Sequence, residues 1–140
     1  MMMKRYGGRT ATAIILYSEW DVLHIKRDTL PFKGYWALPG GRMEADEVVE
    51  QTCVREVKEE TGLDVEIVCK VGDYHEFGCR EGVEYDYYPA CFVVKVVGGQ
   101  VVGQEGEVQE TGFFGLNELP SPLAFEHDQM IRDFKKMFNL

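Results

Sequence analysis

The sequence predicts a single domain of the α+β class, with a mixed β-sheet covered by helices. Short β-branched and apolar segments occur before, between and after two segments with a helical period. The chain has 140 residues, which suits one domain and is long enough to bury a core without disulfides. Because no repeat, low-complexity tract or Pro/Gly/Ser-rich linker divides the sequence, the predicted domain covers residues 1–140.

Strand signals and a punctuated loop occupy the first 41 residues. Residues 10–17 are β-branched and apolar, which predicts a strand, and residues 22–26 are its expected hairpin partner. Residues 30–41 contain two prolines and three glycines around a short apolar piece. This composition predicts a loop.

The first helix is predicted over residues 45–61. Val49, Cys53 and Val57 recur every four residues, so they form one apolar stripe that would dock on the sheet. Gly62 follows directly, at the position where a left-handed C-cap is most often found.

Further strands are predicted at residues 65–71 and 87–97, and the second of these is almost continuously apolar. Phe113 and Phe114 indicate another short strand after a glycine-rich acidic loop. Residues 127–138 have the spacing of an amphipathic helix. Its expected apolar face contains Met130, Ile131, Phe134 and Phe138.

The charge balance limits the partners that this protein can bind. The chain has 24 acidic and 15 basic residues, a formal net charge of -9. Stable nucleic-acid binding and docking on an anionic membrane are therefore not expected, since both need a positive surface. A divalent cation placed between protein carboxylates and phosphates would still allow nucleotide binding.

The cysteines and the N-terminus indicate a reducing, cytoplasmic location. Cys53, Cys69, Cys79 and Cys91 form no C-x-x-C pair, which argues against a zinc or thioredoxin-type site and favours free thiols. Residues 1–8 lack the apolar core of a signal peptide, and no apolar run is long enough to span a bilayer.

Three glutamates carry the strongest chemical signal. Glu56, Glu59 and Glu60 stand at i, i+3 and i+4, so they share one face of the predicted helix. Such a face is either solvated or neutralised by a hard cation such as Mg2+, which prefers oxygen ligands. A glycine-rich loop at 38–41 and the neighbouring Arg55 favour the cation.

This segment resembles the signature of the Nudix hydrolase family, G-x5-E-x7-R-E-U-x-E-E-x-G-U, where U is aliphatic. Residues 41–63 match it at every specified position, and residues 36–40, 113–114 and 116–119 also resemble the family. The matching residues are Gly41, Glu47, Arg55, Glu56, Val57, Glu59, Glu60, Gly62 and Leu63.

The resemblance implies the Nudix α/β/α sandwich and metal-dependent hydrolysis of a phosphoanhydride bond in a nucleoside diphosphate linked to a group X. Mg2+ or Mn2+ is the implied cofactor, and a nucleotide-type small molecule the implied substrate. We favour ADP-ribose or a related nucleotide sugar, because residues 123–128 are similar to the tails of ADP-ribose pyrophosphatases in the family. Against this, Gly78 stands where such enzymes often have proline.

Two other functions stay open. One is a mutator-type house-cleaning (d)NTP pyrophosphohydrolase, and the other is a Nudix-like ligand-sensing domain without activity. The sensor is less favoured because all three glutamates of the signature are present. The apolar residues 89–97 would suit a core strand or the interface of a homodimer equally.

The resemblance also implies roles for single residues. Glu56, Glu60 and the carbonyl of Gly40 are implied metal ligands, and Glu59 is either a further ligand or the base that deprotonates water. Which glutamate is the base stays open. Arg55 is implied to orient the carboxylates, with support from Glu47, and we count Arg55, Glu56 and Glu59 as the catalytic set.

Other candidates come from the loops. Family members often supply a further metal-binding acid downstream of the signature, and Glu105, Glu107 and Glu110 are available. We favour Glu105 from its spacing to the following strand, although a solvated acidic loop is an equal alternative. For the substrate we single out three cations for phosphate and one aromatic ring for a base. These are Arg27, Lys33, Arg42 and Phe32.

Overall fold

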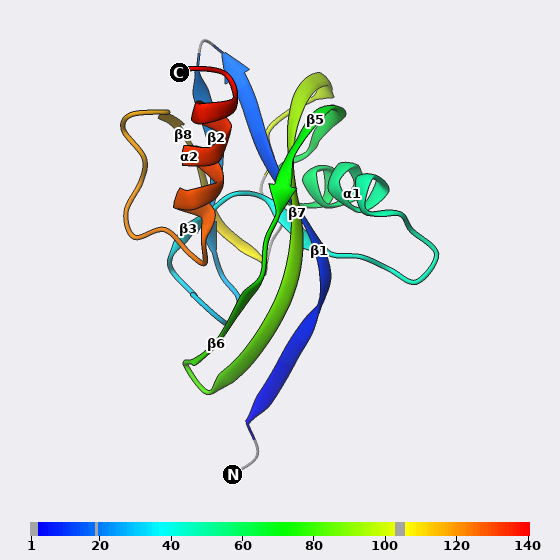
Figure 1. Ribbon diagram of the computed structural model, residues 1–140, viewed down its shortest axis with the longest axis vertical. Coiled ribbons are helices and arrows are strands. Elements are labelled where there is room, and N and C mark those ends of the chain that lie inside the picture. The colour runs from blue at the N-terminus through cyan, green and yellow to red at the C-terminus, as the bar shows by residue number, and fades with distance from the viewer. Residues whose placement is uncertain (1–2, 19, 103–105) are drawn as a thin grey trace.

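The computed structural model of the chain describes residues 3–18, 20–102 and 106–140. A mixed sheet lies between helix α1 (Val49–Thr61) and helix α2 (His127–Met137), which confirms the α+β class and the sandwich (Figure 1). The strands are β1 (Lys4–Ser18), β2 (Asp21–Arg27), β3 (Trp36–Ala37), β4 (Gly40–Arg42), β5 (Leu63–Asp73), β6 (Glu76–Arg80), β7 (Val83–Gly99) and β8 (Val108–Gly115).

Strands β1 and β7 form the centre of the sheet. They run parallel from the Lys4–Val83 pair to the Leu16–Lys95 pair. The main path is β3-β2-β1-β7-β5, with β4 paired to β1, β6 to β7 and β8 to β2. Strand β5 pairs with the second half of β7, and β6 pairs with its first residues. The β6–β7 hairpin therefore lies beside the start of β1 and extends away from the two helices (Figure 1).

Both central strands are apolar on two faces because each face is covered by a helix. On β1, Ala13 and Ile15 belong to the core on the α1 side, together with Cys53 and Val57 of that helix. The neighbouring Ile14 belongs instead to the core on the α2 side. The α2 residues in that second core are Met130, Ile131 and Phe134, as predicted from their spacing. Phe138, predicted on the same face, is 46% exposed instead, because the helix ends at Met137.

Helix α1 begins later than the sequence predicts. Residues 45–48 precede it, and the carboxylate of Glu47 accepts hydrogen bonds from the Glu44 amide and the Thr52 hydroxyl, each 2.9 Å long. These side-chain bonds stabilise a turn in place of a helical first turn. The predicted end is confirmed, because Gly62 has a φ of 81° and its amide bonds to the Lys58 carbonyl.

Strand β6 was not predicted. Its residues, Glu-Phe-Gly-Cys-Arg, carry little β-propensity, so pairing with β7 defines the strand. The two strands are joined through Glu81 and Gly82, both at positive φ, which is the conformation that tight hairpins favour.

All four cysteines are free. Within the described residues, neither helix has the length and apolar character needed to cross a membrane.

Candidate active site

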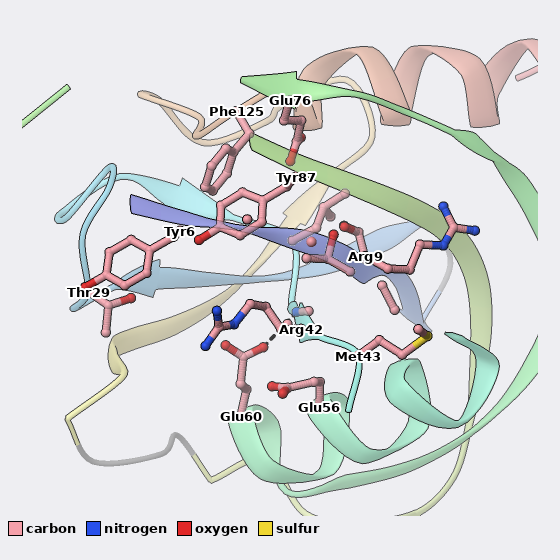
Figure 2. Close-up of a pocket in the computed structure, with 18 of the residues that line it drawn as sticks. Tyr6, Arg9, Thr29, Arg42, Met43, Glu56, Glu60, Glu76, Tyr87 and Phe125 are labelled. Carbon is pink, nitrogen blue, oxygen red and sulfur yellow. Dashed lines mark hydrogen bonds between the residues drawn. The ribbon is translucent and has the colours of Figure 1, made fainter. Parts of the chain in front are cut away.

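A cavity of about 650 Å³ opens between α1, the start of β1, the segment that contains β4, and the β6–β7 hairpin. Figure 2 shows Glu56 and Glu60 pointing from α1 into the cavity, with Tyr6, Tyr87, Phe125 and Glu76 across from them. We call Glu56, Glu60 and Glu107 the carboxylate end. We call Tyr6, Glu76, Tyr87 and Phe125 the aromatic end.

Two glutamates one helical turn apart make up most of the carboxylate end. Glu60 is only 6% exposed, and its Oε1 accepts a 2.7 Å hydrogen bond from the Gly40 amide. The side chain of Glu56 is 13% exposed. A Cβ at Gly41 would overlap the Glu56 carboxyl group, so glycine at this position lets the backbone lie against the carboxylate.

Arg55 ties the acidic side chains together. Its Nε and Nη2 donate to the two oxygens of Glu47 at 2.6 and 2.9 Å, while Nη1 donates to Glu56 at 2.9 Å and to Glu59 at 3.2 Å. Nη2 also donates to the Arg42 carbonyl. Hydrogen bonding from Arg55 lowers the pKa of Glu47 to about 2.

The cavity carboxyls have the opposite electrostatics. Burial raises the pKa of Glu56 to about 7 despite its contact with Arg55, and burial raises the pKa of Glu60 well above its ordinary value. Among the described residues, no three acidic, histidine or cysteine side chains converge closely enough to hold a metal ion in this arrangement. Buried carboxylate oxygens that face a cavity nevertheless fit a hard divalent cation, which would stabilise their ionised form.

The other predicted acids lie in different places. The side chain of Glu59 is 45% exposed and held by Arg55 outside the cavity lining. Glu107 lines the cavity, and its negative charge contributes to the raised pKa values of Glu56 and Glu60. Glu110 pairs with β2 in the sheet, away from the cavity, and Glu105 lies outside the described residues.

The predicted substrate contacts divide in the same way. Arg27 and Arg42 line the cavity, whereas Lys33 and Phe32 do not. Arg27 donates from Nε to the Pro31 carbonyl at 2.9 Å. The ring of Phe32 is 7% exposed and packs under the Arg80 guanidinium, 4.0 Å from the ring centre. The structure thus encloses Phe32 in a cluster next to the cavity.

The aromatic end was missed by sequence reasoning. Tyr6 comes from β1, Glu76 from the start of β6, Tyr87 from β7, and Phe125 from the segment before α2. No local spacing connects these residues. The available signal was the alternation of tyrosines at 85 and 87 on a strand, which places both on one face.

Comparison with known proteins gives consistent results. The family model described as NUDIX domain matches residues 7–134. A protein of Methanocaldococcus jannaschii named ADP-ribose pyrophosphatase is 38% identical over 89% of this chain and 72% of its own length. A putative 8-oxo-dGTP diphosphatase of Bacillus subtilis is 29% identical over 89% of this chain and 78% of its own. The crystal structure of a MutT NUDIX hydrolase from Burkholderia pseudomallei superposes with a TM-score of 0.81 at 25% identity, covering 91% of this chain and 97% of that one.

Proposed function

The chain belongs to the NUDIX domain family, and on that premise we propose that it hydrolyses the diphosphate of ADP-ribose or a related nucleotide sugar with Mg2+ as cofactor. It is a Nudix hydrolase, an enzyme of the pyrophosphohydrolase type, and enzymes of this family generally need a divalent metal ion. The two-ended cavity carries the substrate proposal, because it offers carboxylates for the metal–diphosphate chemistry and aromatic rings for a nucleoside. The name of the relative from Methanocaldococcus jannaschii supports this choice.

The proposed ligands of the cation are the carbonyl of Gly40 and the carboxylates of Glu56 and Glu60. Glu59, which lies outside the cavity lining, is proposed as a further ligand or as the base. Glu107 is proposed as the downstream acid, since it lines the same cavity, while Glu105 stays a prediction from spacing. A divalent cation bound here would neutralise the diphosphate oxygens and lower the pKa of a bound water. Mn2+ has the same preference for oxygen ligands and is the alternative metal.

Arg55 is proposed to position the carboxylates without contacting substrate. Its fork holds Glu47 by two bonds, and its Nη1 group fixes both Glu56 and Glu59. A carboxylate held in this way keeps one orientation throughout the reaction. Glu56 or Glu59 would then take the proton of the attacking water.

Arg27 and Arg42 are proposed to bind the phosphate oxygens. Both line the cavity, and a guanidinium group donates to phosphate in a fixed geometry. They would offset the repulsion between the diphosphate and a chain with a net charge of -9. We further propose that residues 1–140 form one domain that acts in the cytoplasm. We also propose that the protein forms a homodimer, which analytical ultracentrifugation would test.

The decisive experiment incubates the protein with Mg2+ and, in parallel, ADP-ribose, dGTP or 8-oxo-dGTP. We expect AMP and ribose 5-phosphate from ADP-ribose, resolved by chromatography. Release of a nucleoside monophosphate and pyrophosphate from a triphosphate alone would favour the house-cleaning function, which the name of the Bacillus subtilis relative suggests. Binding without hydrolysis of any of the three would favour a ligand sensor.

A further inference from the structure

We propose that the aromatic end is an adenine subsite in which Glu76 accepts a hydrogen bond from the exocyclic amino group of the base. Tyr6, Tyr87 and Phe125 contact the ring of the base. The inference rests on the proposed function and deepens it, because the adenine belongs to the ADP half of ADP-ribose. It identifies a specificity residue far from the metal chemistry.

Glu76 is a buried carboxylate with one oxygen turned to the cavity. It is 6% exposed and lines the cavity from the start of β6. Its Oε2 accepts a 3.2 Å hydrogen bond from the Glu126 amide and lies 3.9 Å from Nε2 of His127. Among the described residues, no donor bonds to Oε1, and this atom is not sealed from the cavity.

The neighbouring cation does not satisfy this oxygen. Arg27 also lines the cavity, but its Nε donates to the Pro31 carbonyl and its Nη2 to the Thr29 hydroxyl. No ion pair within 4.0 Å joins Arg27 and Glu76 in the part of the chain that the structure describes. A buried carboxylate oxygen without a donor is costly, so a ligand that brings a donor is favoured there.

The chemistry of a nucleotide decides which part fits. Phosphate and carbonyl oxygens are acceptors and would repel Glu76, whereas an exocyclic amino group donates to it. The phosphates are instead attracted to the carboxylate end through Arg42 and a bound cation. Arg27 lies between the two ends, with its guanidinium over the Phe125 ring, 5.1 Å from the ring centre. This polarity places the amino edge of the base against Glu76.

The surroundings of Glu76 provide surfaces for a flat ring. Glu76 stands opposite Tyr87 in the β6–β7 register, so both side chains share one face of the sheet. The rings of Tyr87 and Phe125 pack edge to face on each other, 6.0 Å apart at an angle of 79°, so a base would lie against this pair rather than between its rings. On the other side of Tyr87 its partner on β1 is Gly8, where a side chain would meet only open space. Figure 2 shows the ring of Tyr6 on the same side of the cavity as the ring of Tyr87.

The first test compares two substrates on the unmodified protein. ADP-ribose and inosine-diphosphate ribose differ in the base. At C6, the position proposed to face Glu76, the amino donor of adenine is replaced by a carbonyl acceptor, while N1 changes from acceptor to donor. Burial raises the pKa of Glu76 to about 7, so the assay is run near pH 8.5, where the carboxyl is ionised. We expect kcat/KM for ADP-ribose to be at least about tenfold higher.

The second test reverses the polarity of the subsite with Glu76→Gln. The amide oxygen can keep the bond from the Glu126 amide, and the NH2 group then faces the cavity as a donor. The ratio of kcat/KM between the two substrates should fall by about tenfold or more, towards the inosine substrate. Glu84→Gln is the matched control, since Glu84 lies on the same hairpin, exposed and paired with Arg5 at 2.8 Å.

Equal use of both substrates by the unmodified protein would overturn the adenine subsite. So would an unchanged ratio in a folded Glu76→Gln variant, because a carboxylate that binds ribose hydroxyls affects both substrates alike. If ADP-ribose is not hydrolysed at all, the proposed function fails, and calorimetry with AMP and IMP tests the subsite instead. Binding of AMP at least about tenfold more tightly than IMP supports the subsite, and equal binding rejects it. If the variant does not fold, the adenine subsite is tested on the unmodified protein alone, by its preference between the two substrates or between AMP and IMP.

Discussion

The two ends of the cavity are built in different ways. The carboxylate end takes Glu56 and Glu60 from a single helix, four residues apart, and only Glu107 comes from elsewhere. The aromatic end takes one residue each from β1, β6, β7 and the segment before α2. In this protein, one continuous segment supplies most of the groups for the reaction, whereas the groups proposed to select the substrate are assembled by the sheet.

The electrostatics of the two ends also differ. Arg55 brings a positive charge against the acidic side chains of α1 through bonds of 2.6 to 3.3 Å. Two histidines are buried nearby: His127 packs against Phe125 of the aromatic end, and His24 packs against Phe114 of β8. Burial lowers the pKa of His24 to about 4 and that of His127 to about 3. Changes at the first end should therefore affect turnover, and changes at the second should affect substrate choice and acid stability.

The largest effect is expected from Glu60→Gln at the carboxylate end. It removes a proposed metal ligand, so kcat should fall by at least about 100-fold. The melting temperature should stay constant or rise, because a buried carboxyl group with a raised pKa is replaced by a neutral amide. Glu50→Gln, in the exposed first turn of the same helix, is the control and should keep full activity. Full activity of Glu60→Gln would contradict the ligand assignment.

Arg55→Lys should give the next largest effect. Lysine keeps the charge but cannot bridge both oxygens of Glu47 while also holding Glu56 and Glu59. We expect kcat to fall by about tenfold to 100-fold with little change in KM, since Arg55 is proposed to act through the carboxylates. Arg5→Lys, which alters an exposed pair with Glu84, should change neither constant. A raised KM with normal kcat would instead indicate direct contact with substrate.

Substitutions at Arg27 and Lys33 test which of the two candidate phosphate-binding residues contacts the substrate. Both were singled out for phosphate binding, but only Arg27 lines the cavity, while Lys33 lies 3.9 Å from Asp28. Arg27→Lys should raise KM for ADP-ribose by about tenfold, because the fork that pairs with phosphate is lost. Lys33→Ala should change KM by less than about twofold. Similar effects of the two substitutions, measured by steady-state kinetics, would contradict this distinction.

The smallest effect concerns acid stability and the buried His24 of β2. The folded-state pKa of His24 is about 4, below its ordinary value of 6.5, because burial disfavours its charged form. Below pH 6.5 the unfolded chain binds a proton at His24 that the folded protein does not bind. The free energy of unfolding is therefore highest above pH 6.5 and decreases as the pH falls towards 4. At about pH 5 the loss amounts to about 2 kcal/mol, or roughly 5 °C in melting temperature.

His24→Leu should remove this loss. The side chain is fully buried and its Nε2 has no hydrogen-bond partner, so leucine removes an unsatisfied polar atom, at the loss of the 3.1 Å bond between Nδ1 and the Val22 carbonyl. Melting temperatures of both proteins at pH 8 and pH 5 provide the measurement. The drop between the two pH values should be smaller in the variant, and an equal drop would mean that His24 is not the titrating group.

Much of the fold could be predicted because local patterns agree with the final contacts. Val49, Cys53 and Val57, spaced four residues apart, all pack against one face of the sheet. Gly62 ends the helix because it adopts the left-handed conformation. Strand β6 could not be predicted, since pairing with β7 rather than composition makes it a strand. The start of α1 was misplaced because side-chain bonds from Glu47 compete with the first helical turn.

The sequence by itself determined the family, the helix that carries the acids and the order of those acids, because their spacing is fixed by 3.6 residues per turn. The tertiary structure decided that Glu56 and Glu60 face the cavity while Glu59 faces solvent, and that Phe32 is enclosed by Arg80. It also decided that Glu76 and Tyr87 stand side by side across from the acids. Strand register and packing bring such residues together, and neither is written in any short segment of the chain.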